Sequence, residues 1–352
     1  MSIRATRLGR ERPRTGKAVA IAVAAMAVIA CAQAQPAPSS ASPSASPTGP
    51  QVGAPAPPQI VAPPAPQPTS QPGPQTRAQT EPLPGLAPGA TVRLGPGPYP
   101  TLVFRNQRFD PPVTIEAGTA MVMGIRIADS SGIIWRGGNI RSAKGRGENN
   151  PDYWGIHIRE SDTVTIENSQ LSEAYHGMVV GNSRAIIIRN NVFNNLQSDG
   201  MDVAGTSDVL IENNRLSGFY PVKATGSHAD GTWKDGDHPD AVQIWTSPVK
   251  PRVTDITIRG NTIEGDTQGI NLFGPKGDGY ARIIIDNNSV HITYPPAISI
   301  FACDECSIRN NHVWKILGSP YQANIRFEES TGETCGNRMD DWDTHFAMKR
   351  CK

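Results

Sequence analysis

Short runs in which apolar and polar residues alternate recur from about residue 160 onward, and each run is followed by asparagine or another turn-forming residue. Alternation over four to eight residues predicts a strand with one buried face. The runs share an isoleucine at Ile166, Ile188, Ile211, Ile258, Ile285 and Ile308. Spacings of 22, 23, 47, 27 and 23 residues between them indicate a repeat of about 23 residues with one long insertion.

A second alternating strand accompanies each run, as in "DAVQIWT" at residues 240–246. A unit of this length cannot bury its own apolar face and must stack on copies of itself. No amphipathic helical pattern separates the strands, which excludes a sheet built from strand–helix–strand units. The pattern therefore predicts an all-β fold, a single-stranded right-handed parallel β-helix over residues 91–330. Turn asparagines are expected in left-handed backbone geometry, which asparagine tolerates: Asn191, Asn214, Asn261, Asn288 and Asn311.

The first 90 residues differ in composition from the repeats. Residues 1–34 combine a basic start, the apolar run "AVAIAVAAMAVIA" and small residues, the pattern of an export signal. Cleavage at Ala32-Gln33-Ala34 and a lipoprotein signal ending before Cys31 both fit this segment. Residues 35–90 are rich in Pro, Ala, Ser and Gln and predict a disordered tether. We expect an exported bacterial protein, periplasmic, extracellular or anchored to the outer membrane through a lipidated Cys31.

Charge and cysteine content narrow the class of protein further. The net charge is +1, and residues 1–35 carry +5 of it, so the remainder is mildly acidic at −4. This balance argues against a nucleic-acid partner, and we expect a monomer. Four cysteines lie in the last 50 residues, at 303, 306, 335 and 351. In an exported chain they predict two disulfides, with three possible connectivities, in a stapled C-terminal cap over residues 331–352.

Side chains between the interior positions must point outward, and neighbouring coils lie about 4.8 Å apart. His176, Asp199 and Asp240 then share one position on successive coils, and like charges at this spacing destabilise a sheet unless something neutralises them. The insertion at residues 219–238 leads into this face. The predicted catalytic residues are Asp199, Asp202, Asp240, His238, Lys223 and His176. The predicted substrate-binding residues are His157, Gln243, Trp245, Asn271, Phe273, Arg326, Lys234 and His228.

The asparagine-punctuated repeats and the opening "VRLGPGPYPTLVF" (92–104) resemble the pectate-lyase-like β-helix superfamily of carbohydrate-active proteins. The resemblance implies a polysaccharide partner. The first hypothesis is a polysaccharide lyase, or a related uronate epimerase, acting on a polymer that contains uronic acid. In that case Asp199, Asp202 and Asp240 could hold Ca²⁺ against the substrate carboxylate. Lys223, His238 or His176 could supply the base, and Arg326 or Lys234 could offset the substrate charge.

Two other functions fit the same sequence. A glycoside hydrolase similar to polygalacturonases would use Asp199 and Asp240 as its carboxylate pair. Pro239 and Gln268, however, stand where that family has an aspartate and a histidine. The third candidate is a non-catalytic cell-surface module that binds glycans in the groove.

The two cleavage alternatives predict different behaviour of Cys31→Ser. If Cys31 is lipidated, the substitution should release the protein from membranes or block its maturation, because the acyl anchor has no attachment point. Membrane fractionation of cells expressing both forms measures this. Soluble protein from both forms would indicate cleavage after Ala34 instead.

Overall fold

The computed structural model describes residues 83–246, 252–273, 279–340 and 345–351. The chain separates into two units, residues 1–70 and 71–352. The expected export signal, Cys31 and nearly all of the expected tether lie outside the described residues. No helix within the described ranges combines the length and apolar character needed to cross a membrane.

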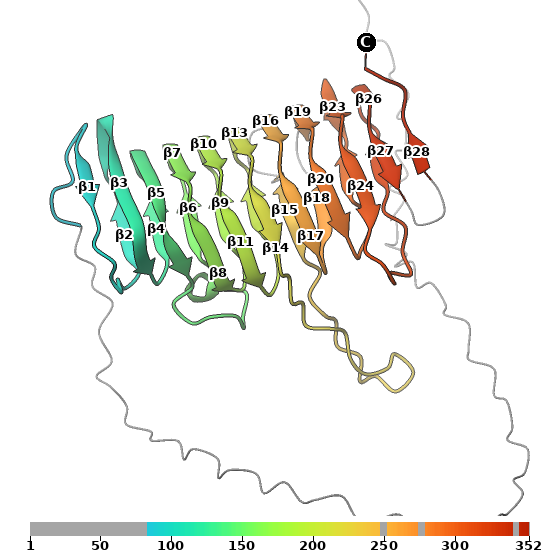
Figure 1. The fold of residues 1–352 in the computed structure, drawn as a ribbon, viewed down its shortest axis with the longest axis horizontal. Coiled ribbons are helices and arrows are strands. Elements are labelled where there is room, and N and C mark those ends of the chain that lie inside the picture. Colours follow the sequence, from blue (N-terminus) through green and yellow to red (C-terminus); the bar gives the residue numbers. More distant parts are fainter. Residues whose placement is uncertain (1–82, 247–251, 274–278, 341–344, 352) are drawn as a thin grey trace, which may run out of the picture. The chain divides into compact units, whose positions relative to one another are not determined.

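The second unit is a stack of coils in which each turn of the chain adds a strand to two sheets (Figure 1). One sheet has nine strands, and all of its pairings are parallel. Its strands, in spatial and chain order, are β2 (Leu102–Arg105), β4 (Ile125–Ala128), β6 (Ile156–Arg159), β9 (Met178–Gly181), β12 (Met201–Ala204), β15 (Asp240–Trp245), β18 (Gln268–Phe273), β21 (Ile298–Phe301) and β25 (Ile325–Glu328). The predicted all-β parallel β-helix is confirmed.

The other sheet has nineteen strands among the described residues, because most coils contribute two short strands to it. These strands are β1 (Thr91–Arg93), β3 (Arg108–Val122), β5 (Ser131–Arg141), β7 (Asp162–Glu167), β8 (Gln170–Ala174), β10 (Arg184–Arg189), β11 (Val192–Leu196), β13 (Ser207–Glu212), β14 (Arg215–Ser217), β16 (Val253–Arg259), β17 (Thr262–Gly265), β19 (Tyr280–Asp286), β20 (Ser289–Ile292), β22 (Cys303–Asp304), β23 (Cys306–Arg309), β24 (His312–Lys315), β26 (Gly332–Cys335), β27 (Arg338–Asp340) and β28 (His345–Ala347). A 3₁₀ turn, η1 (Pro151–Tyr153), lies between β5 and β6.

The interior consists of stacked apolar side chains, as the repeat predicts. Each of the six repeat isoleucines pairs in register with the next one, from Ile166 through Ile308, and all are fully buried. On the nine-stranded sheet, Val242 and Ile244 pair with Met201 and Val203 and are equally buried. A shift of one residue would expose these side chains, so burial fixes which residues point outward.

A ladder of buried asparagines runs along one corner of the coil. The Nδ2 of Asn214 donates to the Ile188 carbonyl (2.9 Å), and its Oδ1 accepts the backbone N–H and the Nδ2 of Asn191 (3.0 Å each). The pattern repeats through the members Asn191, Asn214, Asn261, Asn288, Asn311 and Asn337. The ladder therefore links adjacent coils by side-chain bonds as well as strand pairing.

The expected left-handed geometry of these asparagines is wrong by one position. Positive φ occurs at the residue before each ladder member, as at Asn190 (55°) and Asn213 (55°). The ladder asparagines point inward because a buried carboxamide can satisfy backbone groups of two coils, whereas the left-handed residue forms the bend.

The C-terminal segment continues the repeat past the expected boundary at residue 330. β26 and β27 pair in parallel with β23 and β24, and β28 then pairs antiparallel with β27. Disulfides Cys303–Cys306 and Cys335–Cys351 are formed, and the second ties the last described residues to β26. The predicted pair of disulfides is confirmed, with this connectivity.

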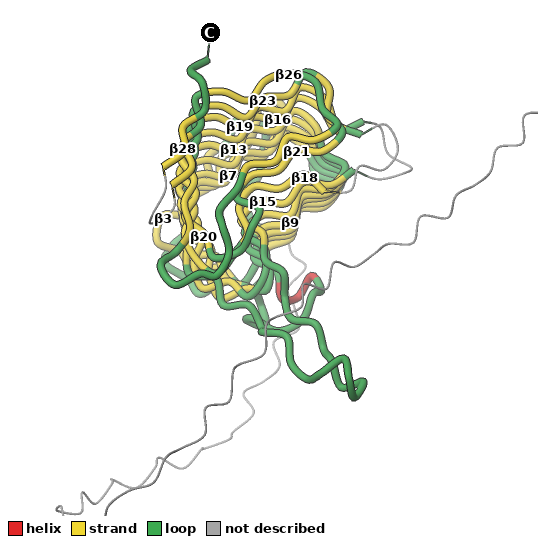
Figure 2. The backbone as a smooth tube through the Cα atoms, turned by 90° about the vertical axis from the view of Figure 1, so that its right-hand side faces the viewer, coloured by secondary structure: helices red, strands yellow, loops and turns green. Residues whose placement is uncertain are grey.

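Two long loops leave the stack at the same corner, seen down the coil axis in Figure 2. The first joins β5 to β6 and contains η1, and the second is the insertion between β14 and β15. Arg146 of the first loop lies 5.3 Å from the Tyr220 ring centroid of the second, and Gln197 bridges the loops by donating to the Gly147 carbonyl (3.3 Å) and to Asp237 (3.0 Å). The two loops are therefore in contact beside the nine-stranded sheet.

The ladder predicts unequal effects of two adjacent substitutions. Asn214→Ala should lower the free energy of unfolding by about 3 kcal/mol, because it leaves the Asn191 N–H and the Ile188 carbonyl buried without their partner. Asn213→Gly should change it by less than about 1 kcal/mol, because glycine readily adopts the positive φ of that position. Urea denaturation midpoints compare the variants. Equal losses from both would rule out the ladder as the source of the effect.

Candidate active site

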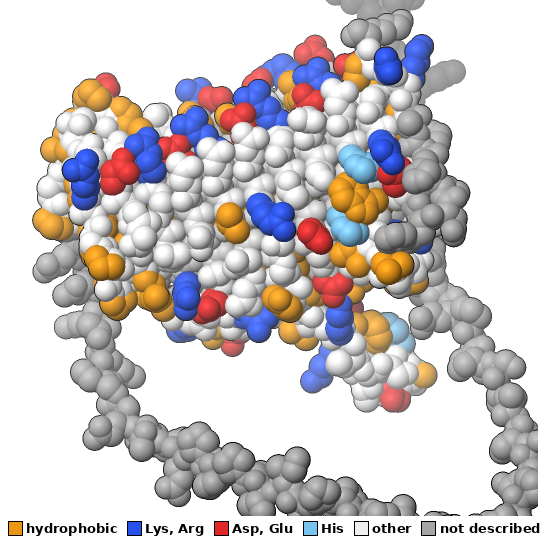
Figure 3. Space-filling view, in the orientation of Figure 1, with side chains coloured by type: hydrophobic (Ala, Val, Ile, Leu, Met, Phe, Trp, Pro, Cys, Tyr) orange, Lys and Arg blue, Asp and Glu red, His pale blue; other side chains and the backbone are white. Residues whose placement is uncertain are grey.

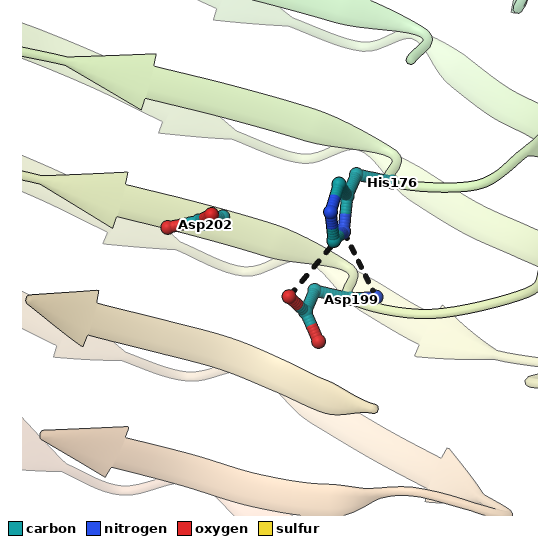
Figure 4. Close-up of side chains that lie close together, drawn as sticks. All are labelled: His176, Asp199 and Asp202. Atoms are coloured by element: carbon teal, nitrogen blue, oxygen red, sulfur yellow. Dashed lines mark hydrogen bonds and ion pairs between the residues drawn. The ribbon is translucent and has the colours of Figure 1, made fainter. Parts of the chain in front are cut away.

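The predicted cluster lies at the start of β9, β12 and β15, on the outer side of the nine-stranded sheet. Met178, Met201 and Val242 pair in register, which aligns His176, Asp199 and Asp240 on three successive coils. Figure 4 shows His176 directed at Asp199, with Asp202 farther along β12. Contrary to a simple solvent-facing column, the three aligned side chains are buried, at 3%, 5% and 1% exposure respectively.

His176 is held as a neutral imidazole with a defined tautomer. The backbone N–H of Asp199 donates to its Nδ1 (3.2 Å), so the ring proton resides on Nε2, which lies 3.0 Å from the Asn149 Oδ1. Burial lowers the pKa of His176 to about 4, although the Asp237 carboxylate opposes this shift. Its Nδ1 also lies 3.3 Å from Oδ2 of Asp199.

Both aligned carboxyls have raised pKa values. Burial raises the pKa of Asp199 well above its ordinary value, and the charge of Asp240 adds to the effect. Burial also raises the pKa of Asp240 to about 7, despite hydrogen bonds to Oδ1 from Asn271 (2.6 Å) and to Oδ2 from Gln243 (2.9 Å). Ser299 in turn donates to Oδ1 of Asn271 (2.8 Å). Near neutral pH this pair therefore retains protons that ordinary aspartates have lost.

Asp202 is the most accessible carboxyl of the cluster. It is half-buried, its Oδ1 is buried without a hydrogen-bond partner, and the Trp245 side chain donates a hydrogen bond to it. Burial raises the pKa of Asp202 to about 6, against the lowering effect of that hydrogen bond. A partly exposed carboxyl that titrates near neutrality is suited to take up and release a proton.

Charged side chains on the nineteen-stranded sheet are arranged differently from those of the acidic cluster. There one column alternates in sign from coil to coil, with pairs such as Arg136–Glu167 (2.5 Å) and Arg259–Glu212 (2.7 Å). Its members are Glu116, Arg136, Glu167, Arg189, Glu212, Arg259, Asp286 and Arg309. Figure 3 shows the alternation as blue and red side chains along the sheet. The two aligned aspartates on the nine-stranded sheet depart from this alternation, which makes them the candidate site.

Four polar residues that the sequence interpretation missed close the site. Asp237 accepts hydrogen bonds from Tyr175 (3.0 Å), Gln197 (3.0 Å) and the Val222 N–H (2.8 Å), which fixes the returning end of the insertion beside His176. The fourth, Asn149, comes from the η1 loop. The extra length of that loop, "GRGENNPDY", was the available signal.

A comparison with protein families matches residues 154–340 to the right handed beta helix region, which is more than half of the chain. The chain belongs to this family. A comparison with curated proteins gave no match.

The solved structures that are similar to this β-helix protein include an adhesin, a lyase and an epimerase. PfbA, a surface adhesin of Streptococcus pneumoniae, is 15% identical with a TM-score of 0.43, over 70% of this chain and 65% of that one. The chain thus spans slightly less than two thirds of the adhesin structure. The alginate lyase from Paenibacillus sp. str. FPU-7 is 12% identical (TM-score 0.32; 74% and 97%). The mannuronan C-5 epimerase AlgE6 A-module of Azotobacter vinelandii is 14% identical (TM-score 0.36; 70% and 84%). Similarities this low do not identify the activity of this β-helix protein.

The β-helix does not bring the predicted loop residues into the cluster. Lys223 pairs with Asp266 (2.8 Å) and with the Tyr294 hydroxyl (2.7 Å). Although burial lowers its pKa, these partners raise the pKa of Lys223 above its ordinary value, the opposite of what a base requires. His228 stacks on Trp233 (4.3 Å) and, like Lys234, lies in the hairpin that projects from the coil in Figure 1.

The other predicted residues spread along the outer face. His238 is exposed, and Asp237 rather than His238 makes the contacts to the site. Arg326 is exposed four coils from Asp202 in the same register column, about 19 Å away at strand spacing. His157 lies two coils to the other side. Phe273 is half-buried and pairs with Trp245, which is 40% exposed.

Calcium fits this arrangement poorly. Ligand atoms of His176, Asp199 and Asp202 lie within 4.8 Å of one another. Ca²⁺ takes six to eight oxygens, yet both oxygens of Asp240 already accept amide protons, and Oδ1 of Asp199 accepts the Asp240 N–H (2.8 Å). Calcium bound by the three aspartates stays a prediction, and no step proposed below uses it.

The raised pKa of Asp202 predicts a pH-dependent stability difference. Because its folded-state pKa of about 6 exceeds the ordinary 3.8, Asp202 favours folding at low pH and loses this contribution as pH rises through 6. Relative to wild type, Asp202→Asn should therefore gain about 2 to 3 kcal/mol of stability between pH 4 and pH 8. Denaturation curves across this range measure the difference, with the exposed Asp208→Asn as a matched substitution outside the cluster. A pH-independent difference for Asp202→Asn would contradict the raised pKa.

Proposed function

We propose that this protein is an exported enzyme that cleaves an acidic polysaccharide by β-elimination. The carrying observation is Asp202, the most accessible carboxyl of the cluster, whose pKa is raised by burial to about 6. It lies beside two buried carboxyls with raised pKa values, Asp199 and Asp240. Because these two retain protons near neutrality, they add little negative charge to repel an acidic substrate.

The elimination can be written with one carboxyl. Ionised Asp202 takes the proton from C5 of a uronate residue, the C5–H electrons form the C4–C5 double bond, and the C4–O4 bond breaks. The protonated Asp202 then returns its proton to O4 of the leaving sugar, so that all atoms and charges balance. His176 and Asp199 act as positioning residues, since their mutual hydrogen bond fixes the start of β12.

The geometry favours elimination over hydrolysis. A glycosidase needs two carboxylates on either side of the scissile bond, about 5 to 9.5 Å apart, with free oxygens that face the sugar. Asp199 and Asp240 are almost fully buried, and three of their four oxygens accept hydrogen bonds from the Asp240 N–H, Asn271 and Gln243. Neither presents a free face to a substrate without rearrangement.

The surroundings of Asp202 suit a chain of sugar rings. Trp245 is partly exposed and lies one coil from Asp202 in the adjoining column, with Phe273 on the next coil. Exposed aromatic rings beside a catalytic carboxyl can stack on the apolar faces of sugars. Export, and attachment through Cys31 and the tether, would give this face access to extracellular polymers.

Asp202→Asn should lower kcat by at least about 10²-fold, because a carboxamide cannot accept the proton. For wild type, kcat/KM should rise as pH increases through about 6, as Asp202 ionises. A panel of uronate-containing and neutral polysaccharides, assayed for unsaturated products by ultraviolet absorbance and for reducing ends, measures both effects.

Asp208→Asn, an exposed carboxylate on β13, is the control and should retain wild-type turnover. Reducing ends without unsaturated product would overturn elimination in favour of hydrolysis. C5 inversion without cleavage would indicate an epimerase, and binding without any reaction would indicate a glycan-binding module. Loss of turnover on addition of a chelator would indicate that catalysis requires a bound cation such as calcium.

A further inference from the structure

A pocket lies on the outer face of the nine-stranded sheet, N-terminal to the acidic cluster along the coil axis. It has a volume of about 280 Å³, near the lower end for small-ligand sites and suited to a single sugar residue. Strands β2, β4 and β6 form its wall, and Pro151 of η1 borders it. The lining residues used below are Val103, Arg105, Arg126, Ala128, His157 and Arg159.

Strand register places two arginines on either side of a small residue. Arg105, Ala128 and Arg159 pair in succession, so the two guanidinium-bearing positions are two coils apart, about 10 Å. Between them Val103, Ile127 and Ala128 contribute an apolar lining. An apolar wall between two cationic side chains matches a sugar ring that carries an anionic substituent.

The two arginines that border the pocket have side-chain N–H groups that are available to bind a ligand. Among the described residues, the guanidinium of Arg105 has no hydrogen-bond or ion-pair partner, and the residue is exposed. Arg159 has one contact, with Glu160 at 3.6 Å, and both side chains of that pair are more than 40% exposed. Such a contact is weak, and it leaves most of the guanidinium N–H donors of Arg159 available to a ligand.

Arg126 supplies a fixed positive charge behind the pocket. Its guanidinium donates to backbone carbonyls of Ile125, Pro151, Trp154 and Gly155, which anchors the η1 loop. Burial lowers the pKa of Arg126 to about 10, so it stays charged near neutrality. Burial, with the positive charges of Arg126 and Arg159, lowers the pKa of His157 to about 4. The pocket is therefore a region of positive potential.

The pocket and the acidic cluster lie on the same outer face of the nine-stranded sheet. In one outward column the order is Arg126, His157, Val179, Asp202 and Gln243. In the adjoining column Arg159 is followed by Gly181, Ala204 and Trp245, so small residues separate the cationic end from the exposed aromatic ring. A polymer lying across the strands would thus meet arginines, then Asp202, then Trp245.

We infer that Arg105 and Arg159 form a subsite for the carboxylate of a uronate residue, and that this subsite selects acidic over neutral polymers. Arg159 lies two coils from Asp202 and Arg105 lies four coils from it. The inference rests on the proposed function for its ligand but concerns binding rather than chemistry. Arg105 and Arg159 are specificity-determining residues here, and Arg126 positions the loop that borders them.

Binding is measured in the Asp202→Asn background, so that no variant cleaves the probe. The probes are a uronate oligosaccharide and the same oligosaccharide with its carboxyls reduced to alcohols. Arg105→Gln combined with Arg159→Gln should weaken uronate binding by about tenfold or more at 0.15 M salt, with little change for the reduced probe. Arg215→Gln, an exposed arginine on β14 of the other sheet, should leave uronate binding unchanged.

The outcomes separate this subsite from the proposed function. If the parent protein binds the uronate probe and the double variant binds it equally well, the subsite is overturned while the enzyme proposal stands. If Arg215→Gln weakens binding as much as the double variant, the effect is one of net charge and the subsite is also overturned. If the parent protein prefers the reduced probe, the acidic substrate class itself fails.

Discussion

The asparagine ladder is the interaction on which the positions of all other groups in the coil depend. Each member joins two coils through a carboxamide that is both donor and acceptor, and none of the ladder is exposed to competing water. Together with the stacked isoleucines it fixes the register of successive coils. A fixed register turns sequence positions about 23 residues apart into neighbours at strand spacing, and so determines which side chains meet on the outer faces.

The same register aligns opposite charges on one outer face and like carboxyls on the other. On the nineteen-stranded sheet, alternating arginine and carboxylate side chains pair from coil to coil, so that even the buried Glu167 is neutralised by partly exposed arginines on both sides. On the nine-stranded sheet, Asp199 and Asp240 are aligned and buried, and their raised pKa values show that the fold holds them against their preference for ionisation. The free-energy cost of burying two aligned aspartates is the reason to propose a functional site on this face.

The loops complete the site without providing its accessible carboxyl. Asp237 and Asn149 come from insertions in different coils, and their hydrogen bonds close the corner beside His176. Asp202 comes from the rigid sheet, and its Cβ direction is fixed by the alternation of β12. Rigid strands therefore position the carboxyl that we propose as the reactive group, and the loops contribute the polar side chains around it.

The sequence determined the coil period, the interior stacks, and the alignment of His176 with both aspartates, because these depend only on alternation and repeat length. It misplaced the left-handed residue by one, since Asn190 and Asn191 are the same residue type and only burial distinguishes them. The tertiary structure decided that Lys223 pairs with Asp266 and that Asp237 enters the site, because loop conformations follow no repeat. It also decided which carboxyls are buried. Strand alternation tells which way a side chain points, but only packing around it sets the solvent exposure that shifts its pKa.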